Sequence, residues 1–261
     1  MGVMQLEYWA PSLRKQTPIT ILFPDRIENR GPYPVFYLLH GLSDSNTVWT
    51  RMTSLERYTE RLPLIVVMPD GQRSFYCDSA TGQRFDEFIA QDLPALIQRF
   101  FHVRDDRAGR CIGGLSMGGY GAIKMALKYP DRYVSATGHS GAYFRDFNQI
   151  RDDLHNELAL HFGGPTLREE DNVFSLAQKN ANASLPALRF DCGVDDFLIE
   201  NNRDLDRHLA QLGIAHEYEE FPGAHSWRYW DEHIQEALTF HCRHLGIEPE
   251  PVKRPFAPPQ E

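Results

Sequence analysis

The stretch Arg110-Cys111-Ile112-Gly113-Gly114-Leu115-Ser116-Met117-Gly118-Gly119 joins two patterns of regular structure through the motif Gly-x-Ser-x-Gly. Its first three residues are typical of a buried strand, and residues 120–128 repeat apolar side chains at helical spacing until Pro130. A serine between a strand and a helix stands on a strained turn, for which flanking glycines leave room. The spacing therefore predicts a nucleophile elbow that presents the hydroxyl of Ser116.

Two later segments carry the residue types that activate such a serine. The partners are a carboxylate and a histidine, in the order Ser, acid, His along the chain. Residues 188–193 are typical of a strand that ends in a glycine, and Val194-Asp195-Asp196 follows at once. The alternating run 216–221 is followed by Pro222-Gly223-Ala224 and then His225. The chain therefore contains both partners in the required order.

The choice of acid lies between two neighbours, Asp195 and Asp196. We predict Asp196, because the apolar Phe197-Leu198 beside it would anchor its loop. Asp195 would then cap the following helix or face solvent. The alternative interpretation is that both are ordinary acids at the start of a helix.

The choice of histidine is argued from position, since the chain has 11. Only His225 lies in a loop between a late strand and the last helical pattern, and we predict it as the general base. His139 follows an apolar strand but has no acid in the matching chain order, and His40 precedes Gly41, where another role is open. The others considered lie in helical patterns or in an irregular middle segment: His155, His161, His208, His233, His241 and His244.

An oxyanion hole requires two backbone N–H donors near the nucleophile. The residue after the serine, Met117, supplies one. The apolar run 35–39 ends in His40-Gly41-Leu42, and the small Gly41 would let the backbone approach a substrate. We therefore predict the N–H groups of Leu42 and Met117 as the donors.

Composition restricts the class of protein. With 261 residues, 42% hydrophobic and 24% charged, the chain is long enough for one domain with a sizeable core. A net charge of −9 without long like-charge blocks argues against nucleic acid or an anionic membrane as partner. The four cysteines are scattered without C-x-x-C spacing, which predicts free thiols.

Targeting, membrane and metal signals are missing from the sequence. The first residues lack a basic segment followed by an apolar core, and no stretch approaches ~20 uninterrupted apolar residues, so a cytoplasmic enzyme is expected. No H-x-x-E-H or comparable ligand spacing supports a metal hydrolase. The serine chemistry predicted above requires neither a metal nor an organic cofactor.

Strand-like and helical patterns alternate along most of the chain, which predicts an α/β fold with a mostly parallel sheet of about eight strands and helices on both faces. The first strands would start antiparallel, and the site residues would lie at the carboxyl ends of later strands. The expected strands are 4–10, 18–23, 34–40, 63–68, 108–113, 133–138, 187–192 and 215–221. The expected helices are 47–61, 86–101, 117–128, 201–212 and 227–244.

Residues 1–247 are expected to form the single domain, with an insertion at 142–186 that interrupts the alternation. This insertion could be a lid or a wall of an acyl pocket, or an elaborated surface connection with its own small core. Its aromatic residues are Tyr143, Phe144, Phe147, Phe162 and Phe174. The proline-rich residues 248–261 predict a mobile tail.

Four motifs taken in order resemble the putative-esterase family of α/β-hydrolases, and the resemblance runs from the third strand to the last helix. The motifs are His40-Gly41-Leu42 with Trp49, the glycine-flanked Ser116 stretch, Cys192-Gly193-x-x-Asp196-Phe197-Leu198, and Pro222-Gly223-Ala224-His225-x-Trp227-x-Tyr229-Trp230. This family includes tributyrin, feruloyl and acetylxylan esterases, S-formylglutathione hydrolases and mycolyltransferase antigens. The resemblance implies the α/β-hydrolase fold. It also implies that the loop 70–76 borders the pocket, with Tyr76 as a substrate contact.

Within this family the chain looks most similar to intracellular tributyrin-type carboxylesterases. Leu115 precedes the nucleophile and Leu42-Ser43 continues the oxyanion loop, where S-formylglutathione hydrolases usually carry a histidine and Ser-Gly-Leu-Thr-Cys. Relatives of this kind are often dimers or tetramers, although the sequence shows no interface signature.

The hypothesis is a carboxylic ester hydrolase that cleaves short-chain acyl esters of small molecules through an acyl-enzyme. Acyl transfer to an alcohol uses the same groups and stays open, as do feruloyl or acetylxylan esters. The departures in the motifs argue against S-formylglutathione. A hydrolase fold that only binds a ligand is the non-enzymatic alternative.

Overall fold

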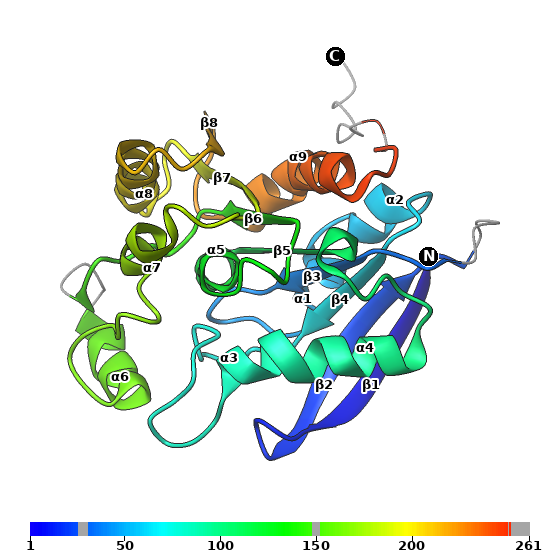
Figure 1. Ribbon diagram of the computed structural model, residues 1–261, viewed down its shortest axis with the longest axis horizontal. Helices are drawn as coiled ribbons and strands as arrows, with labels where there is room; N and C mark the ends of the chain where they lie inside the picture. Colours follow the sequence, from blue (N-terminus) through cyan, green and yellow to red (C-terminus); the bar gives the residue numbers. More distant parts are fainter. Residues whose placement is uncertain (26–30, 148–151, 250, 252–261) are drawn as a thin grey trace, which may run out of the picture.

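The computed structural model describes residues 1–25, 31–147, 152–249 and 251 (Figure 1). One mixed sheet has the strand order β1-β2-β4-β3-β5-β6-β7-β8. β2 pairs antiparallel with β1 and β4, and all later pairs are parallel. The strands are β1 Gly2–Ala10, β2 Lys15–Phe23, β3 Val35–Leu39, β4 Ile65–Pro69, β5 Arg110–Leu115, β6 Ser135–His139, β7 Ala187–Gly193 and β8 His216–Phe221. All eight predicted strands are confirmed, including the antiparallel start.

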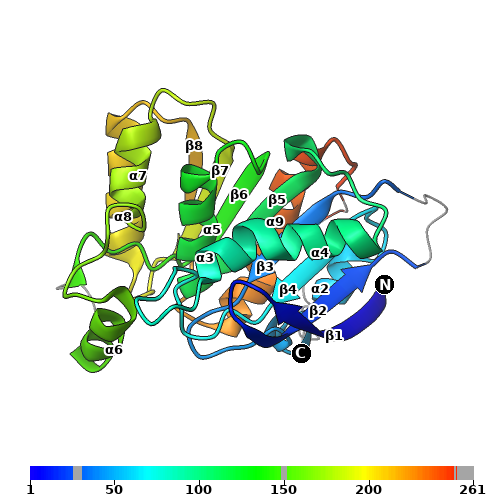
Figure 2. The same ribbon diagram turned by 60° about the horizontal axis from the view of Figure 1, so that its bottom comes forward.

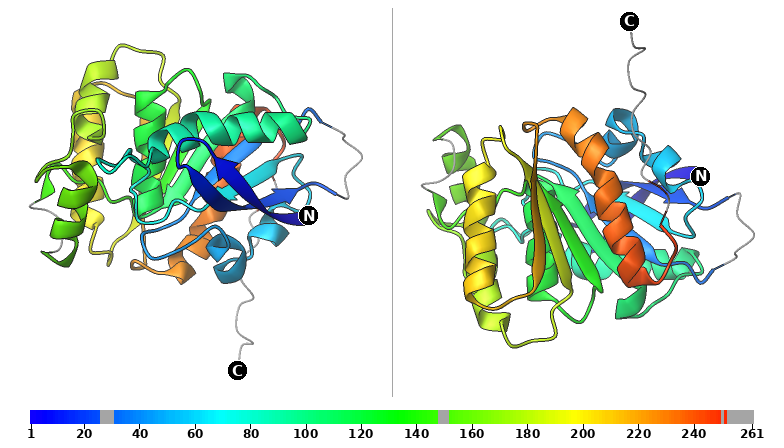
Figure 3. Two further views of the ribbon diagram at one scale, coloured as in Figure 1. Left: turned by 90° about the horizontal axis from the view of Figure 1, so that it is seen from below. Right: turned by 90° about the horizontal axis from the view of Figure 1, so that it is seen from above.

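The helices cover both faces of the sheet (Figures 2 and 3). One hydrophobic core packs α4, α5, α7 and α8 on the first face, and a second core packs α1, α2 and α9 on the other. The bounds are α1 Val48–Met52, α2 Leu55–Thr59, α3 Phe85–Glu87, α4 Leu93–Phe100, α5 Met117–Lys128, α6 Asp152–Phe162, α7 Val173–Asn180, α8 Ile199–Gln211 and α9 Trp227–Leu245. This layering leaves the carboxyl ends of the parallel strands free for a site.

Two predicted helices are interrupted. The helix expected at 47–61 divides into α1 and α2, because Thr53 is extended and its hydroxyl donates to the carbonyl of Trp49. The helix expected at 86–101 contains a π-helical turn, Phe88–Asp92, between α3 and α4. Neither interruption was visible in the apolar spacing.

The insertion at 142–186 is more regular than the sequence indicated, since it contains α6 and α7. His155 and His161 therefore lie on a helix and not in irregular structure. Phe147, Phe162 and Phe174 are buried in the same core as α5. The described part of the insertion shares the main core of the domain.

A buried charge cluster ties this insertion to α5. Lys124 is fully buried, and its Nζ donates to Asp86 Oδ2 at 2.8 Å and to the carbonyl of Tyr76 at 2.6 Å. Asp171, just before α7, lies 3.8 Å from the same Nζ. Burial acts to raise the pKa of Asp86, but Lys124 and Lys128 lower it to about 2. The cluster holds α3, α5, the loop at Tyr76 and the insertion together.

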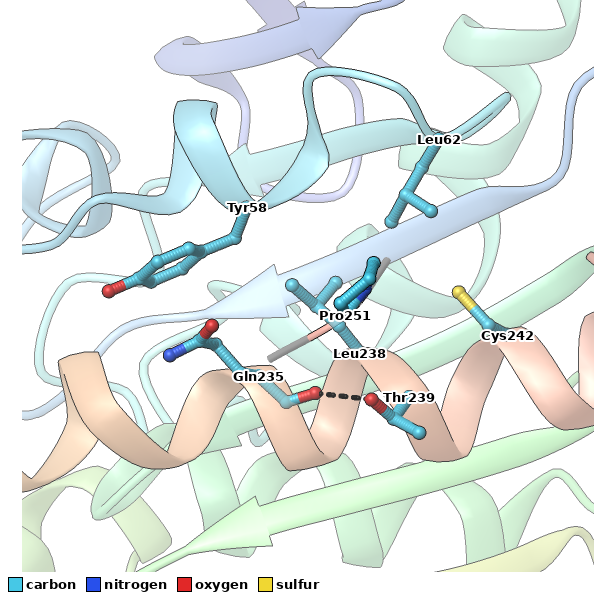
Figure 4. A pocket seen from close by; sticks show the side chains of 7 residues that line it. All are labelled: Tyr58, Leu62, Gln235, Leu238, Thr239, Cys242 and Pro251. Carbon is cyan, nitrogen blue, oxygen red and sulfur yellow. Dashed lines mark hydrogen bonds between the residues drawn. The ribbon is translucent and has the colours of Figure 1, made fainter. Parts of the chain in front are cut away.

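Most of the predicted tail at 248–261 lies outside the described residues. Of its described part, Pro251 helps to line a cavity of about 10 Å³ between α2 and α9 (Figure 4). The other lining side chains are Tyr58, Leu62, Gln235, Leu238, Thr239 and Cys242. This volume is far below that of a ligand pocket.

Other sequence predictions concern cysteines, metals and membranes. All four cysteines are free and buried. Over the described ranges there is no group of three or more His, Cys, Asp or Glu side chains that could hold a metal ion. None of the helices in this part of the chain is long and apolar enough to cross a membrane.

Candidate active site

Ser116 occupies a strained turn between β5 and α5. Its φ is 52° and its ψ is −116°, a conformation that non-glycine residues adopt only when the surroundings impose it. A Cβ on Gly118 would lie 2.5 Å from the carbonyl oxygen of Leu39, and one on Gly114 would lie 2.6 Å from the backbone of Gly118. The flanking glycines therefore allow strand and helix to approach, as predicted for a nucleophile elbow.

The structure brings the three predicted side chains into hydrogen-bond contact. His225 Nε2 lies 3.1 Å from Ser116 Oγ, and His225 Nδ1 lies 2.9 Å from Asp196 Oδ2. Because an ionised carboxylate only accepts hydrogen bonds, Nδ1 carries the proton and Nε2 is free to accept one from the serine. The three residues follow β5, β7 and β8 at the carboxyl edge of the sheet.

The choice between the two acids is decided by burial. Asp196 is 2% exposed, and its Oδ1 accepts from the N–H of Leu198 at 2.9 Å. Asp195 is exposed. Of the two positions expected for it, a helix cap or a solvent-facing site, it therefore takes the solvent-facing one. Leu198 anchors the loop as predicted, but Phe197 is 66% exposed and does not. The ring of Phe197 instead lies 4.5 Å from that of His225.

The predicted oxyanion donors belong to two different segments that meet beside Ser116. Met117 begins α5, so its N–H lacks an acceptor within the helix and carries the positive end of the helix dipole. Leu42 follows β3, and both residues line the same cavity as Ser116 and Gly41. Neither N–H group donates a hydrogen bond to another of the described residues. Both N–H groups are therefore available at the cavity, and their role as oxyanion donors stays a prediction.

His40 holds the loop that carries Leu42. The N–H of Gly71 donates to His40 Nε2 at 2.8 Å, so Nδ1 carries the proton and donates to the carbonyl of Gly41 at 2.7 Å. These two hydrogen bonds link the loop after β3 to the loop at Gly71 and fix the backbone that carries the predicted donor Leu42.

Tyr76 is a correction to the sequence analysis. It was expected as a substrate contact, but it is fully buried and lies outside the cavity lining. Its hydroxyl donates to the carbonyl of His40 at 3.0 Å. Tyr76 therefore supports the oxyanion loop from the core, while Gly41 lines the cavity as expected.

The cavity at Ser116 has a volume of about 410 Å³ and a mainly apolar lining that includes five aromatic side chains. Phe144 and Leu154 come from the insertion, so this segment forms part of the wall. Trp230 packs edge-on against the ring of His225, with centroids 4.8 Å apart. Phe75 comes from the loop 70–76, which the resemblance places at the pocket. The lining residues that sequence reasoning did not assign to the site include Asp44, Phe144, Leu154, Phe197, Trp227 and Trp230.

Asp196→Asn is expected to lower kcat/KM for p-nitrophenyl acetate by about 10³–10⁴-fold, because an amide favours the wrong tautomer of His225 and cannot stabilise an imidazolium. Asp195→Asn makes the same change on the exposed neighbour and should stay within about twofold of wild type. Equal losses in both variants would contradict the assignment of Asp196.

Fold and site together define a class of protein. The sheet has eight strands and is mostly parallel, a serine stands on a strand-to-helix elbow, and a histidine and an acid follow later strands. This arrangement is the α/β-hydrolase fold.

The particular family follows from comparison with known proteins. Residues 10–241 match the model of the family described as "Putative esterase", and the chain belongs to this family. It is 30% identical over 260 residues to the acetyl esterase of Caldicellulosiruptor saccharolyticus, covering 92% of this chain and 98% of that protein. The protein is therefore a serine hydrolase of the carboxylesterase type.

Solved structures agree with this family. The substrate-bound FphF of Staphylococcus aureus, a fluorophosphonate-binding serine hydrolase, has a TM-score of 0.83 at 28% identity, over 92% of this chain and 98% of its own. The S-formylglutathione hydrolase FrmB of the same organism has a TM-score of 0.81 at 27% identity, with the same coverage.

Proposed function

We propose that this protein hydrolyses esters of short-chain carboxylic acids through an acyl-enzyme on Ser116. The observation that carries the proposal is the 3.1 Å contact between His225 Nε2 and Ser116 Oγ at a cavity lined by both residues. A base within hydrogen-bond reach of a hydroxyl on a strained turn is the arrangement that activates serine.

The reaction follows from the positions of these groups. Ser116 Oγ attacks the ester carbonyl while His225 Nε2 takes its proton, and the N–H groups of Leu42 and Met117 hold the oxyanion. His225 then protonates the leaving alcohol, and Asp196 stabilises the imidazolium meanwhile. His225 Nε2 then takes a proton from water as the water attacks the acyl-enzyme, and it returns this proton to Ser116 Oγ as the acyl C–O bond breaks and the carboxylic acid leaves. The side chains and N–H groups named in these steps all belong to one chain. The steps need no metal or cofactor.

Short acyl chains are favoured by the size of the cavity. About 410 Å³ is near the lower end of ligand pockets, and it must hold both the acyl and the alcohol part. The name of the acetyl esterase relative points the same way.

A series of p-nitrophenyl esters from acetate to decanoate tests this. We expect kcat/KM to be highest for acetate to butyrate and at least about tenfold lower for decanoate, because the longer chain cannot be enclosed. Methyl ferulate and S-formylglutathione, run beside the series, cover the activities in the names of solved relatives. A maximum at decanoate, or at either of these two substrates, would contradict the short-chain assignment.

A further inference from the structure

The cavity at Ser116 carries one acidic side chain, Asp44, which the proposed reaction does not use. Of the described side chains that line the cavity, only Asp44 and His225 are titratable, and neither lysine nor arginine is among them. Since Asp44 is half-buried, its charge is only partly screened by water. Asp44 therefore gives the cavity a negative charge that its aromatic side chains do not provide.

The backbone sets the carboxyl group of Asp44 close to the nucleophile. The N–H of Asp44 donates to the carbonyl of Gly41 at 3.2 Å, which closes a tight turn after β3. A Cβ placed on Gly41 would lie 2.8 Å from Asp44 Oδ2 and 3.8 Å from Ser116 Cβ. Asp44 and Ser116 therefore face the same small space across Gly41.

Among residues 1–25, 31–147, 152–249 and 251, the carboxyl group of Asp44 has no cationic partner at ion-pair distance. No ion pair within the described part of the chain includes Asp44. Burial raises its pKa, and the groups that act against this are His40, the N–H of Gly41, Arg51 and His225. Arg51 is exposed, and its Nε donates to Thr47 Oγ1. A positive charge brought by a ligand would meet a carboxylate that no described side chain pairs with directly.

The alcohol part of an ester is the part that would carry this charge. His225 protonates the leaving oxygen in the proposed reaction, so the alcohol lies on the side of Ser116 that faces His225. Asp44 and His225 both line the cavity that holds Ser116. The indoles of Trp227 and Trp230 line the same cavity, and aromatic faces attract alkylammonium groups.

We infer that Asp44 makes the site selective for the charge of the alcohol, favouring esters of cationic amino alcohols and disfavouring anionic ones. This inference rests on the proposed ester hydrolysis. The inference adds a specificity-determining residue and a substrate class to that proposed function.

The test compares acetylcholine with 3,3-dimethylbutyl acetate, its uncharged isostere, at about pH 8, far above the pKa of about 3.9 of a free aspartate. The wild-type kcat/KM should be at least about tenfold higher for acetylcholine, as expected for one partly buried charge pair. Asp44→Asn should reduce this ratio about tenfold. Asp195→Asn, an equal charge change outside the cavity, should leave the ratio within about twofold.

The ratio separates this inference from the proposed function. Hydrolysis of the neutral ester with a wild-type ratio near one, or with a ratio that Asp44→Asn does not change, would overturn the charge selection and leave the esterase assignment intact. An enzyme that cleaves none of the three substrates, acetylcholine, 3,3-dimethylbutyl acetate and p-nitrophenyl acetate, would overturn both the charge selection and the proposed ester hydrolysis. The wild-type ratio needs no variant, so the inference remains testable even if Asp44→Asn folds poorly.

Discussion

Ser116→Ala is expected to abolish ester hydrolysis, lowering kcat for p-nitrophenyl acetate by about 10⁴–10⁶-fold. The methyl group cannot form the acyl-enzyme, and the base His225, 3.1 Å from the hydroxyl, loses the proton that it would accept. Binding and the two N–H donors would remain, which accounts for a small residual rate. Steady-state kinetics on the purified variant measure this loss.

Two controls make this result specific. Circular dichroism and the urea midpoint should match wild type, because removal of a partly exposed hydroxyl has little effect on the fold. Ser184→Ala makes the same change at an exposed serine distant from Ser116 in the sequence, and it should keep activity within about twofold of wild type. A Ser116→Ala enzyme with more than about a tenth of wild-type activity would exclude this serine as the nucleophile.

Gly118→Ala is expected to have the largest effect on folding, lowering the free energy of unfolding by about 3 kcal/mol or more. The new Cβ would lie 2.5 Å from the carbonyl oxygen of Leu39 and 2.7 Å from that of His40. These contacts are with backbone, so relief requires β3 and α5 to separate. That movement would also displace Ser116 and the loop that carries Leu42, and activity should fall with stability.

Gly164→Ala is the matched control, because a Cβ there meets nothing within 4 Å and its φ is not positive. Urea unfolding followed by tryptophan fluorescence compares the two variants. Equal midpoints for both would show that close packing at the elbow is not required.

The parts of the structure that were predictable depend on local pattern or chain order. β5, the elbow and α5 followed from glycine spacing and apolar periodicity, and Asp196 and His225 followed from their places after late strands. Buried parallel strands such as β3 and β4 were recognised as short apolar runs between turn residues, and β8 was recognised by its alternation. Oxyanion donors could be named because they are backbone groups beside recognisable glycines, and their role stays a prediction.

The parts that failed depend on long-range packing. Tyr76 was assigned to the pocket by its loop, but the fold turns its ring into the core beneath His40. Phe197 was expected to anchor a loop and instead lies against His225, because burial of Leu198 leaves its neighbour on the cavity side. The helices of the insertion were missed because α6 and α7 are short and separated by polar residues, and their apolar side chains are buried only against the core shared with α5. Asp44 carried no signal of its own in the sequence.

The central claim is that Ser116 is the nucleophile of this hydrolase, and covalent labelling tests it most directly. A fluorophosphonate should form one adduct per chain, and peptide mass spectrometry should locate it on Ser116. Labelling should slow by orders of magnitude in His225→Ala, because the serine then lacks its base. An adduct on another residue, or an active enzyme that resists the reagent while Ser116 remains unmodified, would contradict the account.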